Sequence, residues 1–147
     1  MTNEETVTRR KWSQRKKLLS GLAITIGISM CVIFPGLFWQ LHEANRSFQN
    51  FADALVAKDY SRAYSFTTQE FHNATNYDSF VKANQDIANR MGDLQRVRFI
   101  QSDIKETRGG WLGTLDANLV FTKGVVQFSY VLKKEKNNWK IYGYQEQ

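Results

Sequence analysis

Apolar and polar residues alternate along the stretch Trp111-Leu112-Gly113-Thr114-Leu115-Asp116-Ala117-Asn118-Leu119-Val120-Phe121. Every odd-numbered position in it is apolar or glycine, and most of the positions between them are polar. A two-residue period is typical of a strand, because successive side chains of a strand point to opposite faces of the sheet. We therefore predict a strand with one buried face over these residues.

The same period predicts three more strands around this stretch. The alternating apolar positions are Val97 and Phe99 before it, and Val126, Phe128, Tyr130, Leu132, Trp139, Ile141 and Gly143 after it. Turn-forming residues separate these segments at 109–110 and 123–124, and a charged loop separates the last two at 133–138. Strands joined by short turns pair with their neighbours in the chain, so we predict a four-stranded antiparallel sheet.

The segment before the strands predicts helices. Residues 37–91 contain no glycine and no proline, and Phe48, Phe51 and Leu55 recur at the spacing of one helix face. Asp59 has the character of a helix cap that opens a short second helix, Thr67–Glu70 predicts a further capped turn, and Gly92 ends a third helical stripe over 77–91. We expect a loop over 73–76. About three helices followed by four strands indicate one α+β domain over residues 41–147.

A long apolar stretch precedes this domain. No charged residue occurs between Lys17 and Glu43, and a helix over Leu18–Trp39 would be ~33 Å long, enough to cross a hydrocarbon core. We predict a transmembrane helix over residues 18–40. A cleavable signal peptide is the competing interpretation, but the segment after Phe38 offers no small-residue cleavage site.

Within the stretch, Ala23, Gly27 and Cys31 recur at four-residue steps. Small residues at this spacing allow a second helix to approach closely, which predicts a helix-packing face. The alternative is that these residues simply face lipid. We expect the lipid bilayer as one partner, together with a membrane protein or a second copy of the chain.

The charge distribution predicts the orientation in the membrane. The chain carries a net charge of +6, and residues 1–17 alone hold six basic and two acidic side chains. This basic tail is expected in the cytoplasm, with the domain on the periplasmic or extracellular side of the cell membrane. The remainder of the chain is nearly balanced, so nucleic-acid binding is not expected.

No catalytic constellation is visible in the domain. Its only histidines, His42 and His72, do not have metal-ligand spacing, and the single cysteine lies in the apolar stretch. Asp103 or Asp116 would serve as a general base only if it faced a cavity, and a solvated carboxylate on a strand face is far commoner. We therefore assign no catalytic residue, no metal site and no cofactor.

Two segments resemble the nuclear transport factor 2-like superfamily and, more loosely, the cystatin-like folds. Residues 51–64, Phe-Ala-Asp-Ala-Leu-Val-Ala-Lys-Asp-Tyr-Ser-Arg-Ala-Tyr, are similar to the helix pair that opens such domains. Residues 134–141, Lys-Glu-Lys-Asn-Asn-Trp-Lys-Ile, are similar to their closing hairpin. The resemblance covers residues 45–147 and implies a cone-shaped domain with a pocket between helices and sheet. It implies no single activity, since the superfamily includes enzymes, transport adaptors and membrane-anchored subunits.

If such a pocket exists, the aromatic residues expected to line it are Tyr64, Trp111 and Tyr130. Tyr142 and Tyr144 alternate away from Trp139 and Ile141, which predicts an exposed patch for a protein partner, or else packing under the first helix.

These observations favour a membrane-anchored, non-enzymatic domain that binds a partner or serves as an accessory or assembly subunit of a membrane complex. The alternative is a small-molecule sensor or carrier that uses the pocket. A third interpretation is an isomerase- or dehydratase-like enzyme with Asp116 or Asp103 in the cavity.

Overall fold

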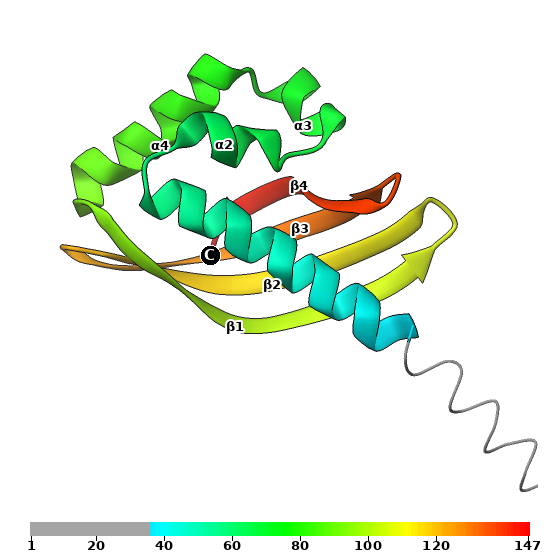
Figure 1. Ribbon diagram of the computed structural model, residues 1–147. Coiled ribbons are helices and arrows are strands. Elements are labelled where there is room, and N and C mark those ends of the chain that lie inside the picture. The colour runs from blue at the N-terminus through cyan, green and yellow to red at the C-terminus, as the bar shows by residue number, and fades with distance from the viewer. Residues whose placement is uncertain (1–35) are drawn as a thin grey trace, which may run out of the picture. The chain divides into compact units, whose positions relative to one another are not determined.

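The computed structural model describes residues 36–147, of which Trp39–Gln147 form one unit by their contacts. The first helix covers residues 36–56 and is coloured cyan in Figure 1. Three shorter helices follow, and then four strands. Their bounds are α2 (Tyr60–Ser65), α3 (Gln69–Ala74), α4 (Tyr77–Met91), β1 (Leu94–Thr107), β2 (Gly110–Phe121), β3 (Gly124–Glu135) and β4 (Asn138–Glu146).

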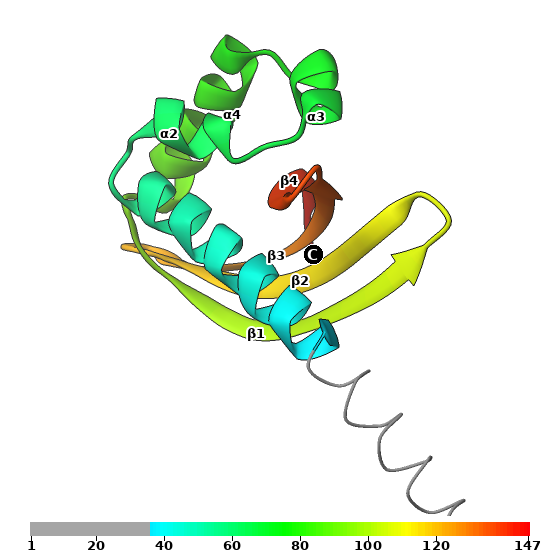
Figure 2. The same ribbon diagram turned by 45° about the vertical axis from the view of Figure 1, so that its right-hand side comes forward.

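The four strands form one antiparallel sheet in the order β1-β2-β3-β4, so each strand pairs with its neighbours in the chain. Figures 1 and 2 show that the helices all lie on one face of this sheet. The predicted α+β class, with helices packed on a four-stranded antiparallel sheet, is confirmed.

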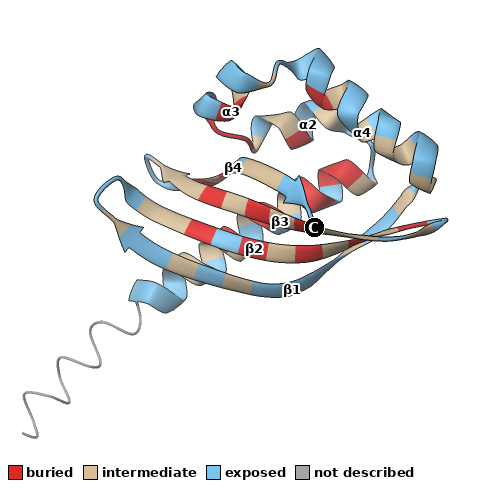
Figure 3. Cartoon of the chain, turned by 180° about the vertical axis from the view of Figure 1, so that it is seen from behind, coloured by how far each residue is buried: buried red, intermediate tan, exposed pale blue. Residues whose placement is uncertain are grey.

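The core lies between the helices and the inner face of the sheet, and the two-residue period of β2 produces it. Leu115, Ala117, Leu119 and Phe121 are all buried, and the register pairs them with residues of β3 that face the same way. In Figure 3 the buried positions of β2 and β3 alternate with more accessible ones, while β1 carries none. The strand pattern predicted for 111–121 and 126–132 is therefore confirmed.

The first helix crosses the inner face of the sheet (Figures 1 and 2). Its buried residues, Phe48, Phe51 and Leu55 among them, follow the three- and four-residue spacing expected for one helix face. The ring centroids of Phe48 and Phe51 lie 4.8 and 5.9 Å from that of Tyr130 in β3, both in edge-to-face geometry. These aromatic contacts join the first helix to the centre of the sheet.

Side-chain caps define the ends of the shorter helices. Asp59, Thr68 and Asn76 each accept a hydrogen bond from the backbone N–H three residues later, at the starts of α2, α3 and α4. The cap expected at Asp59 and the capped turn expected over 67–70 are confirmed, and the structure shows that Thr68 is the capping residue of that turn. The loop expected over 73–76 is shorter than predicted, because α3 extends to Ala74 and Asn76 already caps α4.

Gly92 ends α4 as predicted, and its surroundings require glycine. Its φ is +81°, and a Cβ there would lie 1.8 Å from Oγ1 of Thr122. Glycine thus lets the end of α4 approach the β2–β3 turn closely.

β1 and β4 differ from the strict alternation that the sequence predicts. β1 is longer than expected and has register shifts between Leu94 and Arg96 and between Phe99 and Gln101, so Ile100 has no partner in β2. β4 has a shift opposite Val131 and Leu132, where Tyr142 has no partner. Each bulge inserts one residue and reverses which side chains face the helices beyond it.

The two edges of the sheet differ, because another segment of the described chain pairs with only one of them. β4 is covered on its outer side by the α2–α3 connection: the N–H of Ile141 donates to the carbonyl of Phe66, and the N–H of Thr68 donates to the carbonyl of Ile141, both at 2.9 Å. β1 forms the opposite edge, and within residues 36–147 no strand pairs with its outer side.

An ion pair between Glu70 and Lys133 ties α3 to β3. The Lys133 ammonium donates a hydrogen bond to the Glu70 carboxylate and lowers its pKa to about 2. Because this folded-state pKa lies below that of an unperturbed glutamate, the pair stabilises the fold at neutral pH, and its contribution is lost as the pH falls toward 2.

Among residues 36–147, no helix is both long and apolar enough to cross a membrane. The transmembrane helix predicted over 18–40 lies outside the described residues except for its last five positions. The basic tail and the predicted packing face of Ala23, Gly27 and Cys31 also lie outside them.

Candidate functional site

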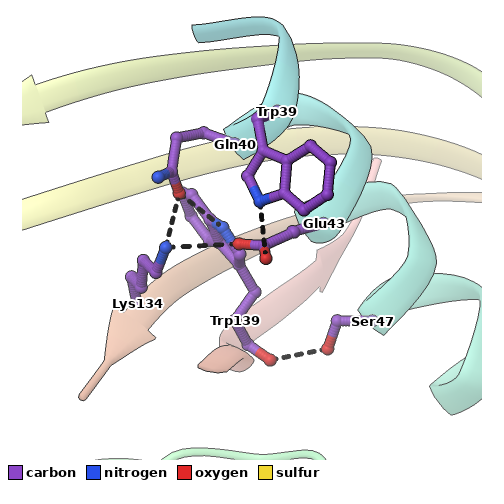
Figure 4. Close-up of polar contacts among 6 residues, drawn as sticks. All are labelled: Trp39, Gln40, Glu43, Ser47, Lys134 and Trp139. Atoms are coloured by element: carbon purple, nitrogen blue, oxygen red, sulfur yellow. Dashed lines mark hydrogen bonds and ion pairs between the residues drawn. The ribbon is translucent and has the colours of Figure 1, made fainter. Parts of the chain in front are cut away.

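A cluster of polar side chains joins the start of the first helix to the β3–β4 hairpin (Figure 4). We call Gln40, Glu43, Ser47, Lys134 and Trp139 the junction cluster. The Lys134 ammonium donates to Oε1 of Gln40 at 2.7 Å and lies 3.2 Å from Oε2 of Glu43. The indole N–H of Trp139 donates to the same Gln40 oxygen at 3.2 Å, and the Ser47 hydroxyl donates to the Trp139 carbonyl at 2.6 Å.

The geometry of this cluster follows from two periodicities. Gln40, Glu43 and Ser47 are three and four residues apart, so they share one face of the first helix beside its apolar face. Lys134 and Trp139 are direct cross-strand partners in the β3–β4 hairpin and therefore face the same side of the sheet. Trp39 extends the cluster, since its indole N–H donates to Oε1 of Glu43 at 2.9 Å.

Partial burial strengthens these contacts. The side chain of Lys134 is 16% exposed and that of Glu43 is 34% exposed, so water screens this pair less than it screens a surface ion pair. Gln40 accepts from both Lys134 and Trp139, and the loss of either donor would leave a partly desolvated oxygen with fewer partners. The cluster therefore holds the first helix at a defined position on the hairpin.

A polar hollow of about 360 Å³ lies next to the junction cluster. Its walls come from the first helix, the end of α2 and the β3–β4 turn, and include Glu43, Arg46, Asn50, Asn138 and Lys140. Charges of both signs line it, so it has no marked preference for a cation or an anion.

A second hollow, of about 460 Å³, lies between the first helix and the first half of β1, and we call it the β1 hollow. Phe48, Val56, Val97 and Phe99 supply apolar walls, and Gln95 and Arg96 of β1 complete its border. Asn45 also lines it, and its Oδ1 is buried without a hydrogen-bond partner among the described residues. A buried amide oxygen without a partner is unusual, which marks this hollow as a candidate binding site.

The predicted pocket residues do not line either hollow. Tyr130 is packed among Phe48, Phe51 and Tyr144, and burial raises the pKa of its phenol. The ring of Tyr64 stacks on that of His72, with their centroids 4.2 Å apart. The Tyr64 hydroxyl donates to the carbonyl of Thr75 at 2.7 Å. Trp111 is half-buried against the core, opposite Glu106 at the β1–β2 turn. The structure distributes these three residues over separate parts of the domain.

The two tyrosines predicted as one partner patch lie in different environments. Tyr142 is the bulged residue of β4 and is 45% exposed. Tyr144 lies opposite Tyr130 and packs on Phe71 and Phe128, and burial raises the pKa of its phenol. The prediction that they share one face is wrong, because the bulge turns Tyr144 toward the helices.

The candidate general bases face away from the core. Asp116 and Asp103 are on the face of the sheet opposite the helices, where Asp116 accepts hydrogen bonds from Gln101 and Ser129 at 2.8 and 2.7 Å. Within residues 36–147 no group of three histidine, cysteine, aspartate or glutamate side chains is placed to hold a metal ion.

Sequence reasoning missed Gln40, Lys134 and Asn45. The Gln40–Lys134 contact joins residues 94 positions apart, and each residue alone resembles an ordinary polar surface position. The one available signal was the apolar hairpin residue Trp139, whose indole N–H needs a partner when buried. Nothing in the local sequence distinguishes Asn45 from its polar neighbours.

No family model matches the chain, and no curated protein matches it. Solved structures with a similar fold include Aln2 from a Streptomyces species, with a TM-score of 0.54 and 9% identity over 74% of this chain and 89% of Aln2. Bd1075 from Bdellovibrio bacteriovorus has a TM-score of 0.52 and 16% identity, and the match covers 69% of this chain but only 38% of Bd1075.

A SEC-C motif-containing protein from Rhodopseudomonas palustris is also similar, with a TM-score of 0.49 and 17% identity over 63% of this chain and 70% of that protein. At these identities the likeness to Aln2 and Bd1075 extends to the α+β fold alone.

The junction cluster generates a stability prediction. In Lys134→Met the side chain keeps much of its apolar length but loses three donors, so Gln40 and Glu43 lose a partner. We expect the free energy of unfolding to fall by about 1–2 kcal/mol, measured by urea denaturation followed by tryptophan fluorescence. The matched control, Lys123→Met at the exposed β2–β3 turn, should change it by less than about 0.5 kcal/mol. Equal effects of the two variants would show that the cluster does not stabilise the fold.

Proposed function

We propose that this chain is a single-pass membrane protein whose C-terminal domain is a non-enzymatic binding or accessory module of a membrane complex. In this proposal residues 18–40 span the cell membrane, residues 1–17 are cytoplasmic, and the domain lies on the periplasmic or extracellular side. The domain is a cone-shaped member of the nuclear transport factor 2-like superfamily.

The sequence supports the membrane attachment. The apolar stretch is long enough to span a bilayer, and six basic residues precede it on the side expected to be cytoplasmic. The described residues add one fact: Trp39, at the end of this stretch, is 62% exposed. Tryptophan is favoured at the interface between membrane and water, because its ring is apolar and its N–H is polar.

The junction cluster is the observation that carries the proposed role. It lies within the first residues after the apolar stretch and fastens the first helix to the β3–β4 hairpin by hydrogen bonds and a partly buried ion pair. A flexible linker is sufficient for a domain that only needs to remain near a membrane. A fastened connection instead suits a domain that must present one surface at a fixed place in a complex.

The resemblance to the nuclear transport factor 2-like superfamily is supported by the order of elements, helices first and then a meander of antiparallel strands. The chain departs from members that insert a hairpin before the third helix, since α2, α3 and α4 follow one another directly. The outward orientation of Asp103 and Asp116 gives no support to the enzyme interpretation, and we assign no catalytic residue.

The test uses the full chain in its native membrane. We expect it to remain in the membrane fraction after high-salt and alkaline washes, and to be purified in mild detergent with a partner protein or as a self-associated species. Gly27→Leu, in the predicted packing face, should lower the recovery of the associated species, whereas Thr25→Leu on the other side of the predicted span should not. Release by salt alone, or a monomer that copurifies nothing, would overturn the proposal.

A second candidate function, binding of a small molecule, is favoured by the β1 hollow. Its apolar walls and the unpartnered Oδ1 of Asn45 fit a ligand with an alkyl chain and an N–H donor. An N-acyl amino acid carries both groups.

The probe for this candidate is N-octanoylglycine in a thermal-shift measurement on the full chain. We expect it to raise the melting temperature of the wild type and to have little effect on Asn45→Leu, while Asn73→Leu, outside the hollow, responds like the wild type. Absence of a shift in the wild type at millimolar probe would count against this function.

A further inference from the structure

The outer edge of β1 is the one edge of the sheet without a backbone partner within residues 36–147. The other edge, β4, is bonded on its outer side to the backbone of Phe66 and Thr68. β1 runs from Leu94 to Thr107 and pairs with β2 alone. A long strand with unpaired backbone groups is a template for pairing with another chain, and proteins normally cover or shorten such edges.

The middle of β1 exposes two large apolar side chains. Phe99 is 49% exposed and Ile100, the bulged residue beside it, is 44% exposed. Neither side chain carries a charge that would repel a neighbouring strand. The centre of the edge therefore gains from losing contact with water.

The charges nearest to Phe99 on the outer face of β1 have opposite signs on its two sides, and the basic Lys105 lies two residues beyond the acidic position. Arg96 and Arg98 precede it, and Asp103 follows it on the same face as the two arginines, as their register with β2 requires. None of these three side chains forms an ion pair among the described residues 36–147. An antiparallel strand of the same sequence would bring the basic half opposite the acidic position.

We propose that the open edge of β1 pairs antiparallel with β1 of a second copy of this chain, about a two-fold axis at Phe99. With the bulged Ile100 left out of the register, this axis places Phe99 of the two copies opposite each other. It also places Arg96 of each copy opposite Asp103 of the second copy, on the outer face of the joined sheet. The alternative axis at Gln101 would place Arg98 opposite Asp103 but also Arg96 opposite Lys105, so its attractive and repulsive pairs offset each other.

Symmetry doubles the Arg96–Asp103 contact, because residue i meets residue j and residue j meets residue i, whereas the Phe99–Phe99 contact lies on the axis and occurs once. The paired strands would form one continuous eight-stranded sheet from two four-stranded sheets. Opposite charges directly across antiparallel strands stabilise the pair, and like charges there destabilise it. The pairing also places the second copy beside Phe99 at the mouth of the β1 hollow.

The second copy would be one partner of the proposed binding module, so this dimer rests on the proposed function. The dimer is nevertheless measured separately from the copurification of another membrane protein. Analytical ultracentrifugation of the full chain in mild detergent measures the monomer–dimer equilibrium. We expect a dimer whose dissociation constant rises about tenfold in Arg96→Asp and likewise in Asp103→Arg, since each change replaces two attractive contacts by two repulsive ones.

The decisive variant carries both changes, R96D and D103R. It restores the two cross-strand pairs with their charges exchanged, so its dissociation constant should return to within about threefold of the wild type. Recovery would also show that the chain carrying both substitutions folds, and the sedimentation of each single variant as a compact monomer tests its own fold. Lys105→Asp, on the same face but without an opposite charge in this register, is the control and should leave the dimer unchanged.

A second measurement uses disulfide formation at the axis. In a Cys31→Ser background, Phe99→Cys should give a disulfide-linked dimer under mild oxidation, because the two introduced thiols lie opposite each other. Val125→Cys, which is exposed on β3 and away from the edge, should remain unlinked.

Three results would overturn the inference: a monomer, a dimer insensitive to Arg96 and Asp103, or a double variant as weak as the single ones. A monomer that still copurifies a different membrane protein would leave the proposed function standing. A monomer that copurifies nothing would overturn both.

Discussion

The contact between the first helix and the sheet is the interaction on which the rest of the domain depends. The sheet is a simple meander with one apolar face, and Phe48 and Phe51 cover its centre by packing edge-to-face on Tyr130. A single sheet with an uncovered apolar face is not stable in water, because the area lost from solvent would be too small. The short helices α2 and α3, with six residues each, cover only one end.

Aromatic packing alone would leave the first helix free to rotate over the sheet. The junction cluster fixes its direction relative to the strands. Ser47, Gln40 and Glu43 bond to the β3–β4 hairpin at the start of the helix. At the other end Lys58, just beyond the helix, pairs with Asp93 at the start of β1 at 2.6 Å. Polar contacts at both ends and aromatic contacts in the middle therefore fix the helix over the sheet. The same arrangement covers β3 and β4 more fully than β1, and leaves the edge of β1 open.

Local pattern predicted much of this fold. The alternation in β2 and β3, the cap at Asp59, the capped turn over 67–70 and the glycine stop at Gly92 each depend on residues close in the chain, and each is confirmed. The bulges at Ile100 and Tyr142 could not be predicted, because an inserted residue becomes visible only when the partner strand is in place. These bulges explain why Tyr142 and Tyr144 do not share a face.

The candidate site was less predictable than the fold. The junction cluster joins residues 91 to 99 positions apart, and the β1 hollow depends on how far the first helix lies from β1. Aromatic residues were expected to line a pocket, but Tyr130 fills the core instead, since a large ring gains more from close packing than from bordering a cavity.

Hydrogen exchange of backbone amides in the full chain, followed by mass spectrometry, tests directly whether the first helix is fastened to the sheet. If the first helix is fastened to the sheet, amides of residues 40–47 should exchange as slowly as those of β2 and β3, because only opening of the whole domain would expose them. Rapid exchange of residues 40–47 while β2 and β3 stay protected would contradict the account, since it would show that the helix start is free of the hairpin.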